Sequence, residues 1–293
     1  AYYNRGLAYL RKGDFNKARA DLSRAIEISP GYAGAHAARG ETFESKGDYD
    51  RAITEYSKAI ELDPRCVLAY NNRAVTYSLK HEYDLAIRDF TRTLEISPKD
   101  TKAYCGRGLT YTVQGNHEQA LADFTKAIEL DPHFVDAYHC RAAVYREQER
   151  FDLAVADCTK AIEMNPGDLG SRYDRGVAYA ESEQYDLALA DFNVVIEKEP
   201  QNAHAFLARA WVYQRQGNQD SALADSQEAV SAYSRAIETR PNEARLYRDR
   251  ALAYFHKGEY ERAWADVHKA ESLGLAVDVE FLADLRQASA HDE

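Results

Sequence analysis

The amino-acid sequence predicts an all-α fold, an α-solenoid of eight consecutive antiparallel helix pairs. An arginine followed by Gly or Ala recurs at a constant 34-residue spacing from Arg5 to Arg209, and an eighth copy, Arg250, follows after a longer interval. Each repeat contains two stretches with helical periodicity, and a proline closes each of the first seven repeats. The arginines are Arg5, Arg39, Arg73, Arg107, Arg141, Arg175, Arg209 and Arg250.

Each repeat divides into a first helix, a turn and a second helix. In residues 69–79 one helical face carries Tyr70, Arg73, Ala74 and Tyr77. A turn such as KGD or QGN follows, with Gly in five of the eight repeats. An acid or Asn begins the second helix, where residues 84–96 present Ala86, Phe90, Thr93 and Leu94 on one face. The closing proline ends this helix because the residue before Pro avoids helical backbone angles.

These signals divide the whole chain, residues 1–293, into one array. The repeats span residues 1–32, 33–66, 67–100, 101–134, 135–168, 169–202, 203–243 and 244–275. Residues 276–293 follow as a capping helix, with Gly274 before it, Asp278 as its N-cap and an apolar face of Phe281, Leu282 and Leu285. The chain begins inside a helix without Met, so we expect it to be truncated, with further repeats or another domain before Ala1.

The 34-residue length, the aromatic residue four positions after each arginine, the alanine thirteen positions after it and the closing proline resemble the tetratricopeptide repeat (TPR) family. The resemblance covers essentially the whole chain. It implies a right-handed superhelix in which first helices line a concave groove and second helices form the convex side. Such hairpins cannot bury their apolar faces alone, so neighbours must stack.

The arginine stands where the family usually has Leu, and in every repeat an acid stands sixteen positions after it. The two positions lie at the same height on facing helices, so we predict a column of ion pairs. The alternative is that both are solvated surface charges. The predicted pairs are Arg5–Asp21, Arg39–Glu55, Arg73–Asp89, Arg107–Asp123, Arg141–Asp157, Arg175–Asp191, Arg209–Asp225 and Arg250–Asp266.

The seventh repeat contains seven extra residues within residues 224–238, which read ADSQEAVSAYSRAIE. Two copies of one helical segment stand in tandem there. Because seven residues are nearly two helical turns, the packing face drifts only about 20° and a continuous helix is predicted. This helix is about 10 Å longer than its equivalents and is expected to overhang the stack, with displacement of the eighth repeat along it as a further expectation. The overhang is either a docking or self-association surface or a tolerated duplication.

Composition excludes several function classes. The net charge of −11 argues against binding to nucleic acid or anionic membranes, and no apolar run is long enough to span a bilayer. Cys66, Cys105, Cys140 and Cys158 lack paired spacing, which suits a reducing, cytoplasmic compartment. His81 and His117 begin incomplete zinc motifs, and a metal site at Cys105, His139 and Cys140 is a minor alternative. We predict no cofactor, no metal, no catalytic residue and no enzymatic activity.

The resemblance also indicates which residues face the groove. Two positions after each arginine stand Leu7, Glu41, Val75, Leu109, Ala143, Val177, Trp211 and Leu252, which form either an apolar groove stripe or core. Near one end an aromatic and arginine cluster is predicted to anchor a peptide, through an acidic side chain or a C-terminal carboxylate. Its residues are Trp211, Arg215, Arg245, Arg248, Phe255 and His256. Asn71 and Asn72 are weaker candidates that would clamp a peptide backbone.

The predicted function is a non-catalytic scaffold that binds a peptide segment of a partner protein in the groove. One alternative is a regulatory or targeting module of a larger enzyme or membrane protein. The other is a structural solenoid that self-associates through the long helix of the seventh repeat.

Overall fold

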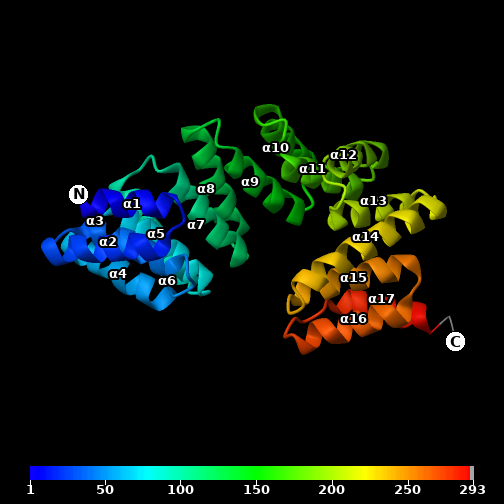
Figure 1. Cartoon of the computed structure of the whole chain (residues 1–293). Helices are drawn as coiled ribbons and strands as arrows, with labels where there is room; N and C mark the ends of the chain where they lie inside the picture. Colours follow the sequence, from blue (N-terminus) through cyan, green and yellow to red (C-terminus); the bar gives the residue numbers. More distant parts are fainter. Residues whose placement is uncertain (291–293) are drawn as a thin grey trace. The chain divides into compact units, whose positions relative to one another are not determined.

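The computed structural model describes residues 1–290, which contain 17 helices and no strand (Figure 1). The helices follow one another as antiparallel pairs, so the predicted all-α repeat fold is confirmed. The chain forms two compact units, Ala1–Val144 and Tyr145–Glu293. Within the described residues no helix is both long enough and apolar enough to cross a membrane.

The first unit contains eight complete helices and most of a ninth. They are α1 (Tyr2–Arg11), α2 (Phe15–Ile28), α3 (Ala33–Glu44), α4 (Tyr49–Leu62), α5 (Val67–Leu79), α6 (Tyr83–Ile96), α7 (Thr101–Val113), α8 (His117–Leu130) and α9 (Val135–Glu147). The second unit begins in the last turn of α9. It continues with α10 (Phe151–Met164), α11 (Leu169–Glu181), α12 (Tyr185–Lys198), α13 (Ala203–Arg215), α14 (Gln219–Thr239), α15 (Ala244–Lys257), α16 (Tyr260–Ser272) and α17 (Val279–Ser289).

The turn inside each hairpin requires one residue with positive φ. Five turns place glycine there, with φ between 73° and 80°: Gly13, Gly47, Gly115, Gly217 and Gly258. The other three place His81, Glu149 and Glu183 in the same left-handed region, at 62°, 57° and 61°. A side chain at such an angle is uncommon and strains the backbone, so these three positions carry a cost that glycine avoids.

The glycine after several arginines makes room for an aromatic ring of the facing helix. A methyl group added to Gly108 would lie 2.7 Å from the Phe124 ring, and one added to Gly176 would lie 2.7 Å from Phe192. Both rings are fully buried. In these two hairpins the ring of the second helix therefore occupies space that a side chain at this position would fill.

We expect Gly108→Ala to lower the free energy of unfolding by about 1–3 kcal/mol, because the methyl group overpacks the Phe124 contact. The loss occurs although Ala is the better helix former. Urea unfolding followed by circular dichroism measures it. Gly31→Ala is the matched control, since nothing lies within 4 Å of a methyl group added there. Equal stability of Gly108→Ala and wild type would contradict this account of the close approach.

Seven of the eight repeated arginines contact the acid of the facing helix in their own hairpin. In the first unit the N–O distances are 2.6–2.8 Å for Arg5–Asp21, Arg39–Glu55, Arg73–Asp89 and Arg107–Asp123. In the second unit they are 2.7 Å for Arg175–Asp191, Arg209–Asp225 and Arg250–Asp266. Arg141 and Asp157 fall in different units, so their pairing stays a prediction. Most of the pairs are largely buried, as for the Arg73 and Asp89 side chains, which are 13% and 2% exposed, whereas Arg5 in the first hairpin is 60% exposed.

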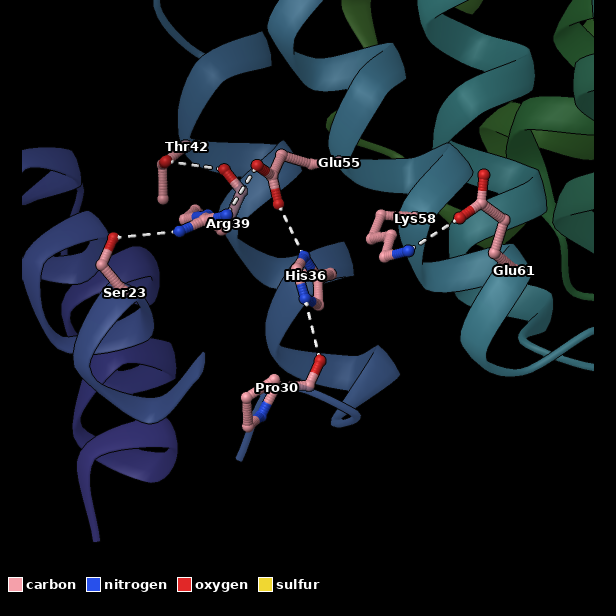
Figure 2. A network of polar contacts seen from close by, with 8 residues as sticks. All are labelled: Ser23, Pro30, His36, Arg39, Thr42, Glu55, Lys58 and Glu61. Atoms are coloured by element: carbon pink, nitrogen blue, oxygen red, sulfur yellow. Dashed lines mark hydrogen bonds and ion pairs between the residues drawn. The ribbon is translucent and has the colours of Figure 1, made fainter. Parts of the chain in front are cut away.

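Most of these arginines also reach the preceding hairpin. Figure 2 shows Arg39, which donates from Nη2 to Glu55 at 2.7 Å and from Nη1 to the Ser23 hydroxyl at 3.3 Å. The acceptor stands two residues after the acid of the previous repeat and is Ser, Thr or Asn. It recurs in Arg73–Ser57, Arg107–Thr91, Arg141–Thr125, Arg175–Thr159 and Arg209–Asn193. One guanidinium therefore joins two hairpins, a role that the sequence pattern contained and our prediction missed.

In α14 the residue that binds the arginine of its own hairpin and the residue that binds the arginine of the next hairpin lie far apart along the helix. Asp225 binds Arg209 at 2.7 Å, but Arg250 of the next hairpin donates to Ser234 at 3.0 Å. Ser234 follows Asp225 by nine residues instead of two. The eighth hairpin therefore docks seven residues, or about 10 Å, further along its neighbour than the others do.

The inserted segment of α14 is packed inside the second unit. Ala229, Val230 and Tyr233 are buried and contact a cluster that includes Phe206 of α13 and Leu246 of α15. The α14 helix is uninterrupted over its 21 residues. The extra turns therefore do not overhang the stack as expected, because α15 docks further along the helix and covers them.

The last helix, α17, closes the second unit. Asp278 accepts hydrogen bonds from the backbone N–H groups of Glu280 and Phe281, as an N-cap does. Phe281 and Leu285 are buried in a cluster with Tyr247 of α15 and Val267 of α16. The predicted capping helix thus covers apolar side chains of the eighth hairpin.

Candidate peptide-binding surface

Trp211 of α13 lies where three hollows of the second unit meet. The central hollow, about 530 Å³, is lined by three successive first helices, α11, α13 and α15. Its walls are mostly apolar and include Tyr173, Val177, Leu207 and Leu252. The volume falls within the usual range for ligand pockets.

The other two hollows continue the central one across the helices, one towards α9 and α10 and the other towards α17. One, about 550 Å³, shares Ala180, Glu181 and Trp211 with it and continues over the turns before α10 and α12. The other, about 330 Å³, shares Trp211, Leu252 and His256 with it and reaches the first turns of α17. We call the three together the Trp211 groove.

The Trp211 ring is held by contacts on α12 and α13. The Arg215 guanidinium, one helical turn later, lies 4.9 Å from the ring centroid. The Tyr185 ring meets it edge-on with the centroids 6.5 Å apart. A cation over an indole face is attracted by the ring's electrons. Arg215 is therefore positioned by Trp211, and the indole stays partly exposed to the groove.

His256 is a neutral member of the groove. Burial lowers the pKa of His256 to about 4, so its ring carries no charge at pH 7. Its Nδ1 lies 2.9 Å from the amide oxygen of Gln214. The adjacent Phe255 ring contacts Tyr260 of α16 and Phe281 of α17. The aromatic part of the predicted cluster is thus brought together, but His256 adds no positive charge to it.

The remaining arginines of the predicted cluster lie elsewhere. Arg248 donates to the buried carboxylate of Asp249 at 2.6 Å, and His204 approaches the same carboxylate at 3.4 Å. Arg245 lies in the first turn of α15. Neither arginine lines the Trp211 groove. The cationic cluster expected from the sequence is therefore reduced to Arg215 at this surface, because Asp249 binds Arg248.

The two predicted asparagines belong to the first unit. Asn71 donates to the Asp100 carboxylate at 3.1 Å, and the backbone carbonyl of Asn72 accepts from Thr76 at 2.9 Å. Asn71 is thus engaged with the start of α7. The pair is not part of the Trp211 groove, which consists of residues from the second unit.

The predicted stripe two positions after each arginine is accessible in most repeats. Val75 and Leu109 of the first unit are 42% and 46% exposed. In the second unit Val177, Trp211 and Leu252 line the central hollow together. Val177, Trp211 and Leu252 also pack against buried clusters, so these residues belong both to the groove wall and to the edge of the core.

The cysteines of the candidate metal site lie in apolar surroundings. Cys105 and Cys140 pack in an apolar cluster with Phe124 and Val144. A hydrogen bond with Cys140 and burial raise the pKa of Cys105, which keeps this thiol protonated. Among residues 1–290 we find no group of three or more His, Cys, Asp or Glu side chains placed to hold a metal ion.

Several family models for the tetratricopeptide repeat match this sequence. One matches residues 1–32, 67–100 and 101–134, and others match 43–81, 124–156, 142–213 and 223–271. The chain belongs to the TPR family. The TPR repeats make it a protein-interaction scaffold. A search of curated proteins returns no match.

Three solved structures illustrate what this TPR protein is similar to. A TPR protein from Parabacteroides merdae is 23% identical, with a TM-score of 0.69 over 88% of this chain and 99% of that one. YrrB, described as a TPR protein with an unusual peptide-binding site, is 28% identical, with a TM-score of 0.51 over 60% of this chain and 91% of its own. MamA is 26% identical, with a TM-score of 0.50 over 55% and 94%.

Proposed function

We propose that this TPR protein is a non-catalytic scaffold that binds a peptide segment of a partner protein in the Trp211 groove. The observation that carries the proposal is a partly exposed tryptophan at the junction of three contiguous hollows. Tryptophan is among the residues that dominate binding energy at interfaces when they occupy the centre of a contact. The apolar central hollow with polar extensions on both sides suits a side chain anchored in an extended segment.

Two further observations support a peptide over a small molecule. The groove is open and continues across α11, α13 and α15 to α17, so it can contact several consecutive residues of a bound peptide. YrrB, which shares the repeat fold at 28% identity, is described as having a peptide-binding site. The polar groups that line the groove include no nucleophile–base pair among the described residues, which favours binding over catalysis.

Trp211→Ala is expected to weaken peptide binding at least about tenfold, because it removes the aromatic anchor shared by all three hollows. Peptides selected from a display library on the wild-type protein would be measured by fluorescence anisotropy. Leu109→Ala, at the equivalent position of the first unit, is the matched control. Binding that survives Trp211→Ala but not Leu109→Ala would move the site to the first unit and refute the proposal.

Self-association through α14 finds less support. The residues that lengthen this helix are buried between α13 and α15 instead of forming a free ledge. We therefore assign the insertion a role inside the second unit. Light scattering over a range of concentrations tests this assignment, and a monomer throughout is the expected result.

A further inference from the structure

We propose that the segment bound in the Trp211 groove is apolar at its centre and carries Lys or Arg on both sides. This inference rests on the proposed function and names the chemistry of its partner. It replaces the acidic or C-terminal segment that the sequence pattern suggested, because the two arginines behind that expectation do not line the groove.

The centre of the groove selects an apolar side chain. Val177, Leu207, Ala208 and Leu252 supply aliphatic surface, and Trp211 adds an aromatic wall. The ring of His256, which also lines this hollow, is neutral and already bonded to Gln214. Among the described residues the one carboxylate that lines this hollow is Glu181, and it already lies 3.8 Å from Arg146. A charged group placed here would lose its hydration and gain little compensating charge, which is costly. A bulky aliphatic or aromatic side chain gains free energy by burial instead.

One end of the groove is acidic. Its hollow is lined by four glutamates and two arginines, namely Glu147, Glu149, Glu181, Glu183, Arg146 and Arg215. Both arginines already have partners. Arg146 lies 3.8 Å from the carboxylates of Asp174 and Glu181, and Arg215 lies over the Trp211 ring. Four carboxylates against two guanidinium groups give this end a net negative charge.

Two of these glutamates occupy costly backbone positions. Glu149 and Glu183 stand in adjacent hairpin turns at φ values of 57° and 61°, where five other turns have glycine. Both side chains are exposed and line the same hollow beside Trp211. Strained residues of this kind concentrate at functional sites. The fold thus carries two carboxylates next to the groove at positions where glycine would be easier to accommodate.

The opposite end is acidic as well. Asp278, Glu280 and Asp284 of α17 line the hollow on the far side of Trp211, next to the apolar Phe281. Among the described residues, neither Lys nor Arg lines this hollow. Together the two ends hold seven carboxylates against two arginines, with the apolar centre between them. Charges of one sign along a groove attract a ligand of the opposite sign and speed its association.

Three synthetic peptides with one common Phe-Leu-Phe centre test the proposal. They carry two lysines, two glutamines or two glutamates on each side, and their affinities are measured by isothermal titration calorimetry at low and at physiological salt. The lysine peptide is expected to bind at least about tenfold more tightly than the glutamate peptide, with the difference shrinking as salt screens the charges. Glu149→Gln with Glu183→Gln is expected to weaken only the lysine peptide, by about threefold to tenfold.

The control variant is Glu61→Gln with Glu95→Gln, which removes two exposed carboxylates from α4 and α6 of the first unit. Equal affinities for the lysine, glutamine and glutamate peptides, all lost in Trp211→Ala, would overturn the charge proposal and leave the proposed function standing. Tighter binding of the glutamate peptide would also overturn it. Failure of all three peptides, and of peptides selected from a library, would overturn the proposed function itself.

Discussion

An Arg107→Leu variant is expected to lose about 3 kcal/mol of unfolding free energy. The Asp123 side chain is 8% exposed and the Arg107 side chain 19%, so the substitution leaves a carboxylate buried without its cation. It also removes the hydrogen bond from Arg107 to Thr91 of the preceding hairpin. The midpoint of urea unfolding, followed by circular dichroism, measures the loss.

The double variant Arg107→Leu with Asp123→Leu is expected to recover much of that stability. Two apolar side chains need no desolvation of charges, which offsets the attraction lost with the ion pair. Arg92→Leu is the control, because Arg92 forms an exposed pair with Glu95 and such pairs contribute little. A double variant as unstable as the single one would show that Asp123 is not left uncompensated by the loss of Arg107.

Deleting residues 226–232 is expected to weaken binding in the Trp211 groove while the protein still folds. The deletion joins Asp225 to Tyr233 and Ser234, which reproduces the order of Glu55, Tyr56 and Ser57 in the second repeat. Arg250 then finds its hydroxyl acceptor two residues after the acid, as the other arginines do. The eighth hairpin moves back by about 10 Å along α14, which changes how Leu252 and His256 lie against Trp211.

Titration of the library-selected peptides into the deletion variant measures this effect, and at least about tenfold weaker binding is expected because one wall of the groove is displaced. Circular dichroism establishes that the variant is folded. A four-residue deletion, residues 226–229, is the control, because it rotates Ser234 by about 40° relative to the packing face and is expected to destabilise the second unit. Full peptide affinity in the folded seven-residue deletion would refute the link between the insertion and the groove.

The repeats could be predicted well because the local signals are strong. The 34-residue spacing and the closing prolines predict the helix pairs. The positions of Arg107 and Asp123 within the repeat predict that the arginine and the acid lie opposite each other on facing helices. The hydroxyl partners, such as Thr91, were equally periodic in the sequence. They were missed because their role depends on how one hairpin docks on the next, which periodicity within a hairpin does not encode.

The candidate site was predicted only in part, for the same reason. Trp211 belongs to a stripe whose exposure follows from its place in the repeat, and Arg215 follows it by one helical turn. Arg248 was misjudged because its neighbour Asp249 is buried and binds it, an outcome decided by tertiary packing. The acids of α17 were missed since nothing local shows where a terminal helix lies.

Because most of the repeated arginines bind both the acid of their own hairpin and a polar side chain of the preceding hairpin, the contacts between neighbouring hairpins are alike along the regular repeats. A hairpin that offers an acid and, two residues later, a hydroxyl or amide accepts any successor that brings the same arginine, so an engineer can splice, delete or recombine the regular repeats. The seventh repeat combines two docking positions. Its contacts with the sixth hairpin follow the regular register, whereas the eighth hairpin docks seven residues further along α14. A seven-residue insertion in one second helix can therefore change the surface at that repeat while the other repeats keep their contacts.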